Sequence, residues 1–286
     1  MQRFEGLYVA TRTARLYRTM LVMVALLVYG MGSLAHASSS AETVVRLSPL
    51  GTIAEQSRGM IKAGIRDGLI ATGQVEPLVA ETIAGFGSSA FDTRRIRARL
   101  VNDLNTDLND RQLQTVERWY ESDLGQRLSL AETEAAMPPA WEAMATAAPG
   151  LRKQFDGTRR QQLFDRYDQA VGASQRAVET ALAVQLHLAE ALAALSEGDT
   201  AESVKEQVLA NRPMIERQVG EQVYLAYLYM YQAFSDQELA EYVGFLESPE
   251  GRAFTGSASK SIHAAIIEPV STVGNQLVRL LGPGGE

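Results

Sequence analysis

The sequence predicts an all-α fold, and three observations lead to that prediction. From residue 39 onward, apolar residues recur at every third or fourth position and almost never alternate over the length of a strand. The composition, with 46% hydrophobic and 21% charged residues, is that of an ordinary globular chain. The 286 residues contain no cysteine, so a buried core and not disulfides must hold the fold together. We expect a multi-helix bundle of about a dozen helices without a sheet.

Residues 1–37 have the features of a secretory signal peptide. Four arginines against the single Glu5 precede an apolar stretch from Met20 to Leu34, and Ala35-His36-Ala37 supplies a small-x-small cleavage site. The apolar stretch is shorter than the roughly 20 residues that a membrane-spanning helix needs. We expect cleavage after Ala37 and a periplasmic or secreted protein, with an uncleaved N-terminal anchor as the alternative.

The charge balance excludes some classes of partner. The chain has 27 Lys plus Arg and 34 Asp plus Glu, and residues 1–37 hold four of the former and one of the latter. The mature chain would therefore carry 23 basic and 33 acidic residues, a formal net charge of −10. Such a domain repels phosphate backbones and anionic lipid, so we expect no nucleic acid and no stable membrane insertion after signal removal. The lack of cysteine excludes a thiol nucleophile and a thiolate metal site.

Proline and glycine mark the expected helix boundaries. Pro138-Pro139, Pro149-Gly150 and residues 197–199 are the strongest breaks. Between the last two, the run from Arg159 to Ser196 has high helix propensity, and Gly172 is its one weak point.

An internal repeat suggests that the bundle consists of two related halves. Residues 108–128 align with residues 234–254 at a constant offset and without a gap, and five positions are identical. We therefore expect a first half at 38–150, a second half at 151–281 and a flexible tail at 282–286. The identical pairs are Asp110 and Asp236, Leu113 and Leu239, Glu121 and Glu247, Ser122 and Ser248, and Gly125 and Gly251. The two halves are expected to pack on each other through the segment from Pro213 to Phe234.

The repeat begins with a helix-start signal. In the second copy, Ser235 and Glu238 form the two ends of a capping box, and Phe234 and Leu239 occupy the positions of a hydrophobic staple. The first copy has the weaker equivalents, namely Asn109 and Gln112 for the box and Leu108 and Leu113 for the staple.

The repeat ends with a second helix start. Ser248 is a helix cap, and Pro249 stands at the first helical position. The N–H that proline lacks would have no partner within the helix at that position. Ser122 is the equivalent cap in the first copy. Gly251 and Gly125 then fall in the first turn of the following helix, where glycine is unfavourable. We expect close approach of the preceding helix to require glycine there.

The second copy carries a resemblance to a known family. The signature of the exported bacterial family called domain of unknown function 2059 resembles two stretches of this copy, Tyr231-Gln232-Ala233-Phe234-Ser235-Asp236-Gln237-Glu238-Leu239 and Phe245-Leu246-Glu247-Ser248-Pro249-Glu250-Gly251-Arg252-Ala253-Phe254. Residues 105–128 look like a degenerate copy. The resemblance implies an all-helical, exported, mostly Gram-negative protein, and it implies no catalytic or ligand residues.

Three local motifs have a chemical interpretation that the surrounding sequence weakens. Residues 103–107 begin like a calcium loop, but Leu108 stands where that loop needs glycine, which favours a solvated helix face. Residues 257–260 match the S-x-x-K nucleophile motif without its partner motifs. His187 and Glu190 have the spacing of metal ligands, but a bundle metal site needs that motif twice. We expect no metal and no cofactor.

Four tyrosines lie close together on one expected helix. Tyr224, Tyr227, Tyr229 and Tyr231 fall within eight residues on a helix that is apolar nearly all round. The helix is expected either to be buried between the two halves or to present Tyr224, Tyr227 and Tyr231 to a groove for a peptide or an apolar ligand. Buried hydroxyls would each need a hydrogen-bond partner.

These features favour a non-enzymatic binding or assembly module of the bacterial cell envelope, with an envelope protein or peptide as its partner. The alternative is an envelope enzyme or an apolar-ligand binder that uses the tyrosine-rich helix 223–231. An inward-facing acid beside Tyr227 or Tyr231 in a closed cavity would favour the enzyme. A third hypothesis, a structural protein that dimerises, predicts an exposed apolar patch instead.

Overall fold

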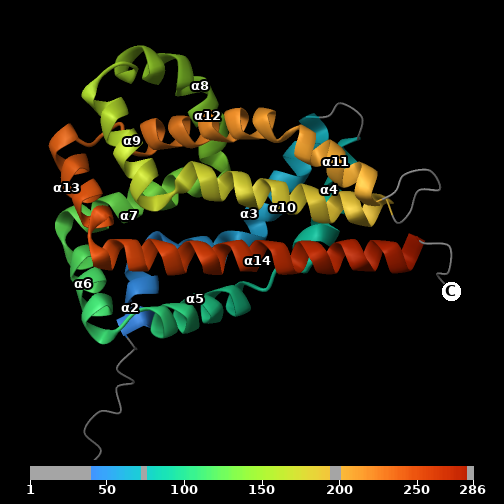
Figure 1. The fold of residues 1–286 in the computed structure, drawn as a ribbon, viewed down its shortest axis with the longest axis horizontal. Helices are drawn as coiled ribbons and strands as arrows, with labels where there is room; N and C mark the ends of the chain where they lie inside the picture. The colour runs from blue at the N-terminus through green and yellow to red at the C-terminus, as the bar shows by residue number, and fades with distance from the viewer. Residues whose placement is uncertain (1–39, 72–75, 194–200, 282–286) are drawn as a thin grey trace, which may run out of the picture. The chain divides into compact units, whose positions relative to one another are not determined.

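The computed structural model describes residues 40–71, 76–193 and 201–281, which form thirteen α-helices and no strand (Figure 1). The predicted all-α fold is therefore confirmed. The expected signal peptide, the break at 197–199 and the tail at 282–286 lie outside the described residues. None of the described helices combines the length and the apolar character needed to cross a membrane.

The helices follow one another with short connections. In chain order they are α2 (Ser40–Leu47), α3 (Pro49–Ala71), α4 (Pro77–Ser89), α5 (Thr93–Asp107), α6 (Asp110–Glu121), α7 (Asp123–Ala136), α8 (Pro138–Phe155), α9 (Arg159–Val171), α10 (Ala173–Ala193), α11 (Ala201–Ala210), α12 (Arg212–Met230), α13 (Asp236–Glu247) and α14 (Pro249–Leu281).

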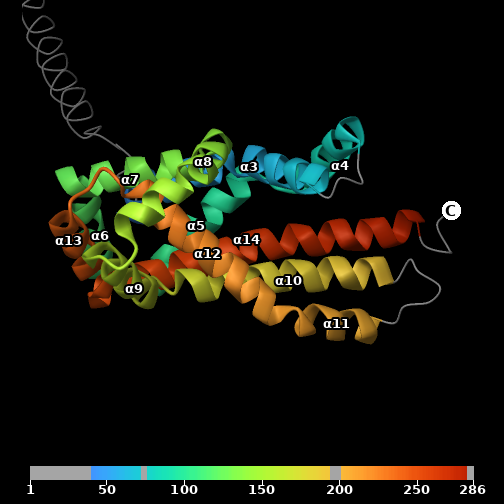
Figure 2. The same ribbon diagram turned by 90° about the horizontal axis from the view of Figure 1, so that it is seen from above.

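The longest helix, α14, lies side by side with α10, and α10 also packs on α12 (Figures 1 and 2). On the other side α14 packs on α5 and α6, while α3 packs on α4 and α5. Helix α12 contacts α7 from the expected first half, α10 from the expected second half, and α8, which spans the boundary expected between them. The two halves, and their packing through Pro213–Phe234, stay predictions.

Two main clusters of buried side chains form the core. The first joins α2, the start of α3, α5, α6 and the start of α14, and the second joins α7, α8, α9, α12 and α13. Trp119 of α6 and Phe245 of α13 pack against both clusters, with their rings stacked at a centroid distance of 4.5 Å. These two residues occupy equivalent positions when residues 108–128 are aligned with residues 234–254, so the two aligned segments meet at this stack.

Both helix-start signals of the repeat are confirmed. The Oγ of Ser235 accepts the amide of Glu238, and the Glu238 side chain accepts the amide of Ser235. Asn109 and Gln112 form the same reciprocal pair at the start of α6. The staple residues Phe234 and Leu239 are buried in the second cluster, and Leu108 and Leu113 are buried in the first.

The turns at Ser122 and Ser248, here called the serine corners, are alike in detail. Ser248 separates α13 from α14 and accepts the amide of Gly251, with Pro249 as the first residue of α14. Ser122 separates α6 from α7 and accepts the amide of Gly125 in the same way, at 3.0 Å in both cases. The chain therefore changes direction at one residue in each copy.

Close approach of the preceding helix explains both glycines. A Cβ on Gly251 would lie 2.1 Å from the carbonyl oxygen of Phe245, and a Cβ on Gly125 would lie 2.0 Å from that of Trp119. These carbonyl groups could move away from a Cβ only if the turn between the two helices changed. The expected reason for these glycines is confirmed.

One expected break is wrong. Pro149 lies inside α8, so the boundary placed at 150 cuts through a helix. Leu151 is buried in the second cluster and Ala147 packs against it, and this packing keeps α8 continuous although proline removes a backbone hydrogen bond. The chain turns later, at Gly157, whose φ is 74°. Gly172, by contrast, ends α9 with φ 62°, as the weak point in the long run suggested.

A buried arginine joins α9 to the turn between α12 and α13. The guanidinium of Arg160 donates to the carbonyl oxygens of Tyr231 at 2.7 Å and Phe234 at 2.5 Å, and to the carboxylate of Asp236 at 2.8 Å. Its carbon lies 4.8 Å from the centre of the Phe155 ring. Only 5% of the Arg160 side chain is exposed, so its charge depends on these partners and has little water around it.

We predict that Gly251→Ala lowers the free energy of unfolding by about 1–3 kcal/mol because the new methyl group overlaps the Phe245 carbonyl. Gly256→Ala on the same helix is the control, since a Cβ there meets nothing within 4 Å. That variant should gain up to about 1 kcal/mol from helix propensity. Urea unfolding of both proteins measures the difference, and equal effects would contradict the close-approach explanation.

We also predict that Arg160→Met costs about 3 kcal/mol of stability, because it leaves two carbonyl groups and Asp236 without their donor. Arg166→Met on the same helix is the matched control, since Arg166 pairs with Glu247 at the surface. An exposed pair contributes less than about 1 kcal/mol. Urea unfolding should rank the two variants in this order.

Candidate functional site

The three tyrosines singled out in the sequence lie in the core. Tyr224, Tyr227 and Tyr231 are at least 91% buried, and their rings pack on Phe164 and Tyr167 of α9. The three side chains are thus part of the core, although most of the first half of α12 is exposed, and none of them lines the central pocket described below. An open groove formed by these tyrosines is not present.

Their hydroxyl groups differ in their partners. The hydroxyl of Tyr224 donates to Asp156 at 2.8 Å, and that of Tyr231 donates to Glu132 at 2.5 Å. The buried hydroxyl of Tyr227 has no hydrogen-bond partner within the described part of the chain. Tyr231 therefore connects the buried helix to an acid on α7.

Glu132 is the centre of a tyrosine cluster. Its Oε1 accepts the hydroxyl of Tyr231 at 2.5 Å and that of Tyr242 at 2.6 Å. Burial raises the pKa of the Glu132 carboxyl above its ordinary value, and the two hydrogen bonds oppose that rise. Burial also raises the pKa values of both tyrosines, and the nearby Glu132 charge adds to this. Neither of the two hydrogen bonds uses the second oxygen of Glu132.

Glu132 stands in the wall of a cavity of about 710 Å³, here called the central pocket. Helices α3, α7, α10, α13 and α14 contribute most of its wall, and Tyr120, Tyr167 and Tyr242 lie with Glu132 on its polar side. The rest of the lining is mainly apolar and includes Leu50, Ile53, Ala177, Ala181, Ile262 and Ile266.

Two further hollows share lining residues with the central pocket. A smaller cavity of about 200 Å³ toward α5, here called the apolar extension, shares Leu50, Ile53, Ile262 and Ile266 with it. An open depression of about 540 Å³ between α10 and α14 is here called the polar mouth. The polar mouth shares Arg176, Thr180, Ser259 and His263 with the central pocket and adds Lys260.

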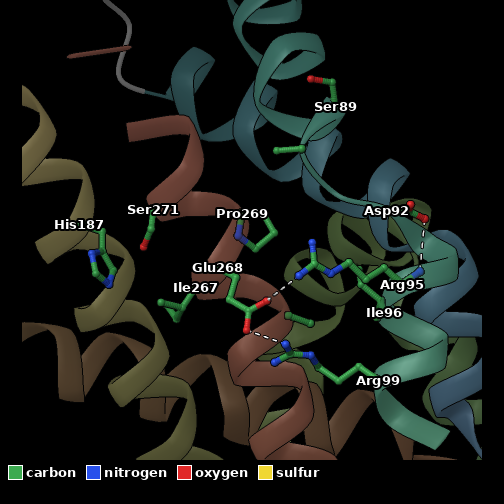
Figure 3. A pocket seen from close by; sticks show the side chains of 12 residues that line it. Ser89, Asp92, Arg95, Ile96, Arg99, His187, Ile267, Glu268, Pro269 and Ser271 are labelled. Carbon is green, nitrogen blue, oxygen red and sulfur yellow. Dashed lines mark hydrogen bonds and ion pairs between the residues drawn. The ribbon is translucent and has the colours of Figure 1, made fainter. Parts of the chain in front are cut away.

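A separate hollow lies between α5, α10 and α14 (Figure 3). Glu268 of α14 reaches Arg99 of α5 at 2.6 Å and Arg95 at 3.8 Å, and His187 of α10 stands across from them in Figure 3. The charges of this hollow are thus paired across helices, which is the arrangement of a structural ion pair. The described residues contain no group of three or more side chains that could hold a metal ion.

The other two motifs are not brought into a site. The Asp103 carboxylate accepts the hydroxyl of Ser261 at 2.6 Å, while Leu104 and Leu108 are buried in the first cluster. Ser257 is buried, and Lys260 extends into solvent with Asp107 at 3.7 Å. The serine and the lysine of S-x-x-K therefore lie on different faces of α14.

Sequence reasoning missed Glu132, Tyr242 and Arg176. A signal for Glu132 was present, because Leu128 and Ala135 of the same helix are buried and Glu132 stands at the helical spacing between them. An acid on an apolar stripe needs a partner. No comparable signal marks Arg176, whose position depends on how α10 packs against α14.

We predict that Glu132→Gln stabilises the protein increasingly as pH rises. The glutamine can still accept both hydroxyls, and it removes an acid whose folded pKa is raised by burial. The neutral acid contributes stability that is complete below its ordinary pKa of about 4.5 and is lost as pH rises through the folded value. Thermal unfolding of both proteins between about pH 3 and 8 should therefore diverge toward high pH.

Glu238→Gln is the control of opposite sign. The Ser235 amide and hydroxyl, with Arg127, lower the pKa of Glu238 to about 2. Its contribution is present above the ordinary pKa and lost as pH falls toward 2. This variant should be less stable than the parent at neutral pH and converge with it in acid. The same pH trend in both variants would contradict the raised pKa of Glu132 and the lowered pKa of Glu238.

The comparisons with known proteins give no relative, since no family model, no curated protein and no solved structure matches this chain.

Proposed function

We propose that this protein is a non-enzymatic binding protein of the bacterial cell envelope, exported through the signal at residues 1–37, that holds an apolar or amphiphilic small molecule in the central pocket. The resemblance of residues 231–254 to the exported family domain of unknown function 2059 supports the location, and we propose that family for this chain.

The observation that carries the proposal is the central pocket itself. Its volume of about 710 Å³ lies in the range of small-molecule sites, about 300–1,000 Å³. Such sites are mainly apolar with a few placed polar groups, and here Glu132 with Tyr242 supplies them on one wall. A partly open pocket with this size and lining can admit a small molecule.

An enzyme is supported less well. The acid beside Tyr231 that would favour one is present in Glu132. The closed cavity that an enzyme would need is not present, because the central pocket is itself partly open to solvent and water would enter. The oxygen of Glu132 that faces the tyrosines is already engaged twice. Binding is therefore the better proposal.

An assembly role is a second candidate because of α4. Leu78, Val79, Ile83 and Phe86 of this helix are all exposed, which is an unusual number of large apolar side chains for one short helix. Exposed apolar patches favour a protein partner. Native mass spectrometry distinguishes the two candidates, since it reports both the number of copies and any retained small molecule.

We predict that the protein binds the neutral apolar probe N-phenyl-1-naphthylamine and that Ala177→Trp weakens this binding at least tenfold, about 1.4 kcal/mol. Ala177 lines the central pocket, so the indole would fill part of the cavity. The control is Gln185→Trp, which adds the same group on an exposed position of α10. Probe fluorescence measures both affinities.

A protein that retains no molecule from its own envelope fraction and binds no apolar probe would overturn the proposed function. Circular dichroism spectra of the two tryptophan variants establish that a loss of binding does not come from unfolding.

A further inference from the structure

The apolar extension fits a hydrocarbon chain better than a peptide. Its lining side chains are apolar except for Ser57, and the hydroxyl of Ser57 already donates to the Ala54 carbonyl at 2.7 Å. A peptide in this extension would bury amide groups without partners, which costs several kcal/mol for each group. An alkyl chain has no such groups, and it gains from every apolar contact.

The opposite end of the cavity is cationic. Arg176 of α10 and Lys260 of α14 stand on the two sides of the polar mouth, and His263 lies between this mouth and the central pocket. The acid in the lining of the mouth is Glu179, which accepts a hydrogen bond from Gln175 at 2.9 Å. Asp107 of α5 is 3.7 Å from Lys260. Two permanent cations therefore border the polar mouth, although the protein as a whole is acidic.

The cationic groups lie at the rim, and no strong ion pair among the described residues neutralises them. Arg176 donates to the Thr255 carbonyl at 3.3 Å, and His263 shares a hydrogen bond with Thr180 at 2.9 Å. Lys260 is largely exposed beside Asp107, and such a pair contributes little. An anion at the rim would gain a charge-assisted hydrogen bond from Arg176, and the charge of Lys260 would add to the attraction.

The three hollows thus differ in charge and apolarity in a fixed order. Arg176 and Lys260 line the polar mouth, Arg176 also lines the central pocket, and Ile262 and Ile266 line both the central pocket and the apolar extension. A molecule that matches this order has a charged end and one apolar tail.

We propose that the ligand is a single-chain amphiphile with an anionic head group, a carboxylate or a phosphate monoester, bound with its head at Arg176 and Lys260 and its chain in the central pocket and the apolar extension. This inference rests on the proposed function, since it names the ligand class of the same pocket.

The experiment compares head groups on one chain. Palmitate, hexadecyl phosphate, hexadecanol and hexadecylamine compete with N-phenyl-1-naphthylamine for the full protein, at concentrations at which they stay monomeric. We expect palmitate or hexadecyl phosphate to bind at least tenfold more tightly than hexadecanol, and hexadecylamine to bind most weakly. The order of the two anions identifies whether the head is a carboxylate or a phosphate.

Two variants test the placement of the head. Arg176→Gln combined with Lys260→Gln should remove the preference for the anions over hexadecanol. Lys260→Gln alone keeps the contact of Arg176 with Thr255 and should remove part of the preference. Arg252→Gln is the control, because this arginine is exposed on α14 outside the mouth.

The outcomes separate this inference from the proposed function. Equal affinity for all four molecules, or a preference for the amine, overturns the anionic head while the pocket keeps its binding role. Binding of none of them, together with no binding of the probe, overturns both. An anion preference that survives in the double variant overturns the placement at Arg176 and Lys260.

Discussion

The structure depends most on the buried guanidinium of Arg160. Its three hydrogen bonds fix the backbone of Tyr231 and Phe234 and the first turn of α13 against α9. A turn between two helices leaves carbonyl groups without internal partners, and here a side chain from 71 and 74 residues earlier supplies them. The ring stacking of Phe155 on the same guanidinium ties the end of α8 to this point. Arg160 therefore joins the four helices α8, α9, α12 and α13 at one point.

That position also determines the wall of the central pocket. Because the Tyr231 backbone is held by Arg160, its hydroxyl reaches Glu132 on α7, and Tyr242 of α13 reaches the same oxygen. The acid is kept in an apolar wall at a cost in desolvation, and two donors offset part of that cost. Two hydrogen bonds thus hold the polar side of this wall, whereas Leu50, Ile53, Ile262 and Ile266 on the other side are apolar.

The parts of the fold that the sequence predicts well are those fixed by neighbours along the chain. The capping boxes at Asn109 and Ser235, the serine corners and the crowded glycines all join residues no more than six positions apart, so the pattern contains their full cause. The break predicted at Pro149 is wrong because distant packing of Leu151 outweighs a local preference. The sequence does not predict the roles of Arg160 and Glu132, because their partners lie 71 to 110 residues away and no local spacing encodes such a pairing.

The same division between near and distant contacts has a consequence for folding kinetics. The serine corners close loops of three residues, whereas Thr180 and His263 at the rim of the pocket are 83 residues apart and Tyr231 and Glu132 are 99 apart. Loop closure entropy delays contacts between distant residues, so the corners form early and the pocket is completed last. An interaction absent from the transition state slows unfolding without speeding folding. A ligand in the central pocket would therefore prolong the lifetime of the native state and leave the time needed to reach it unchanged.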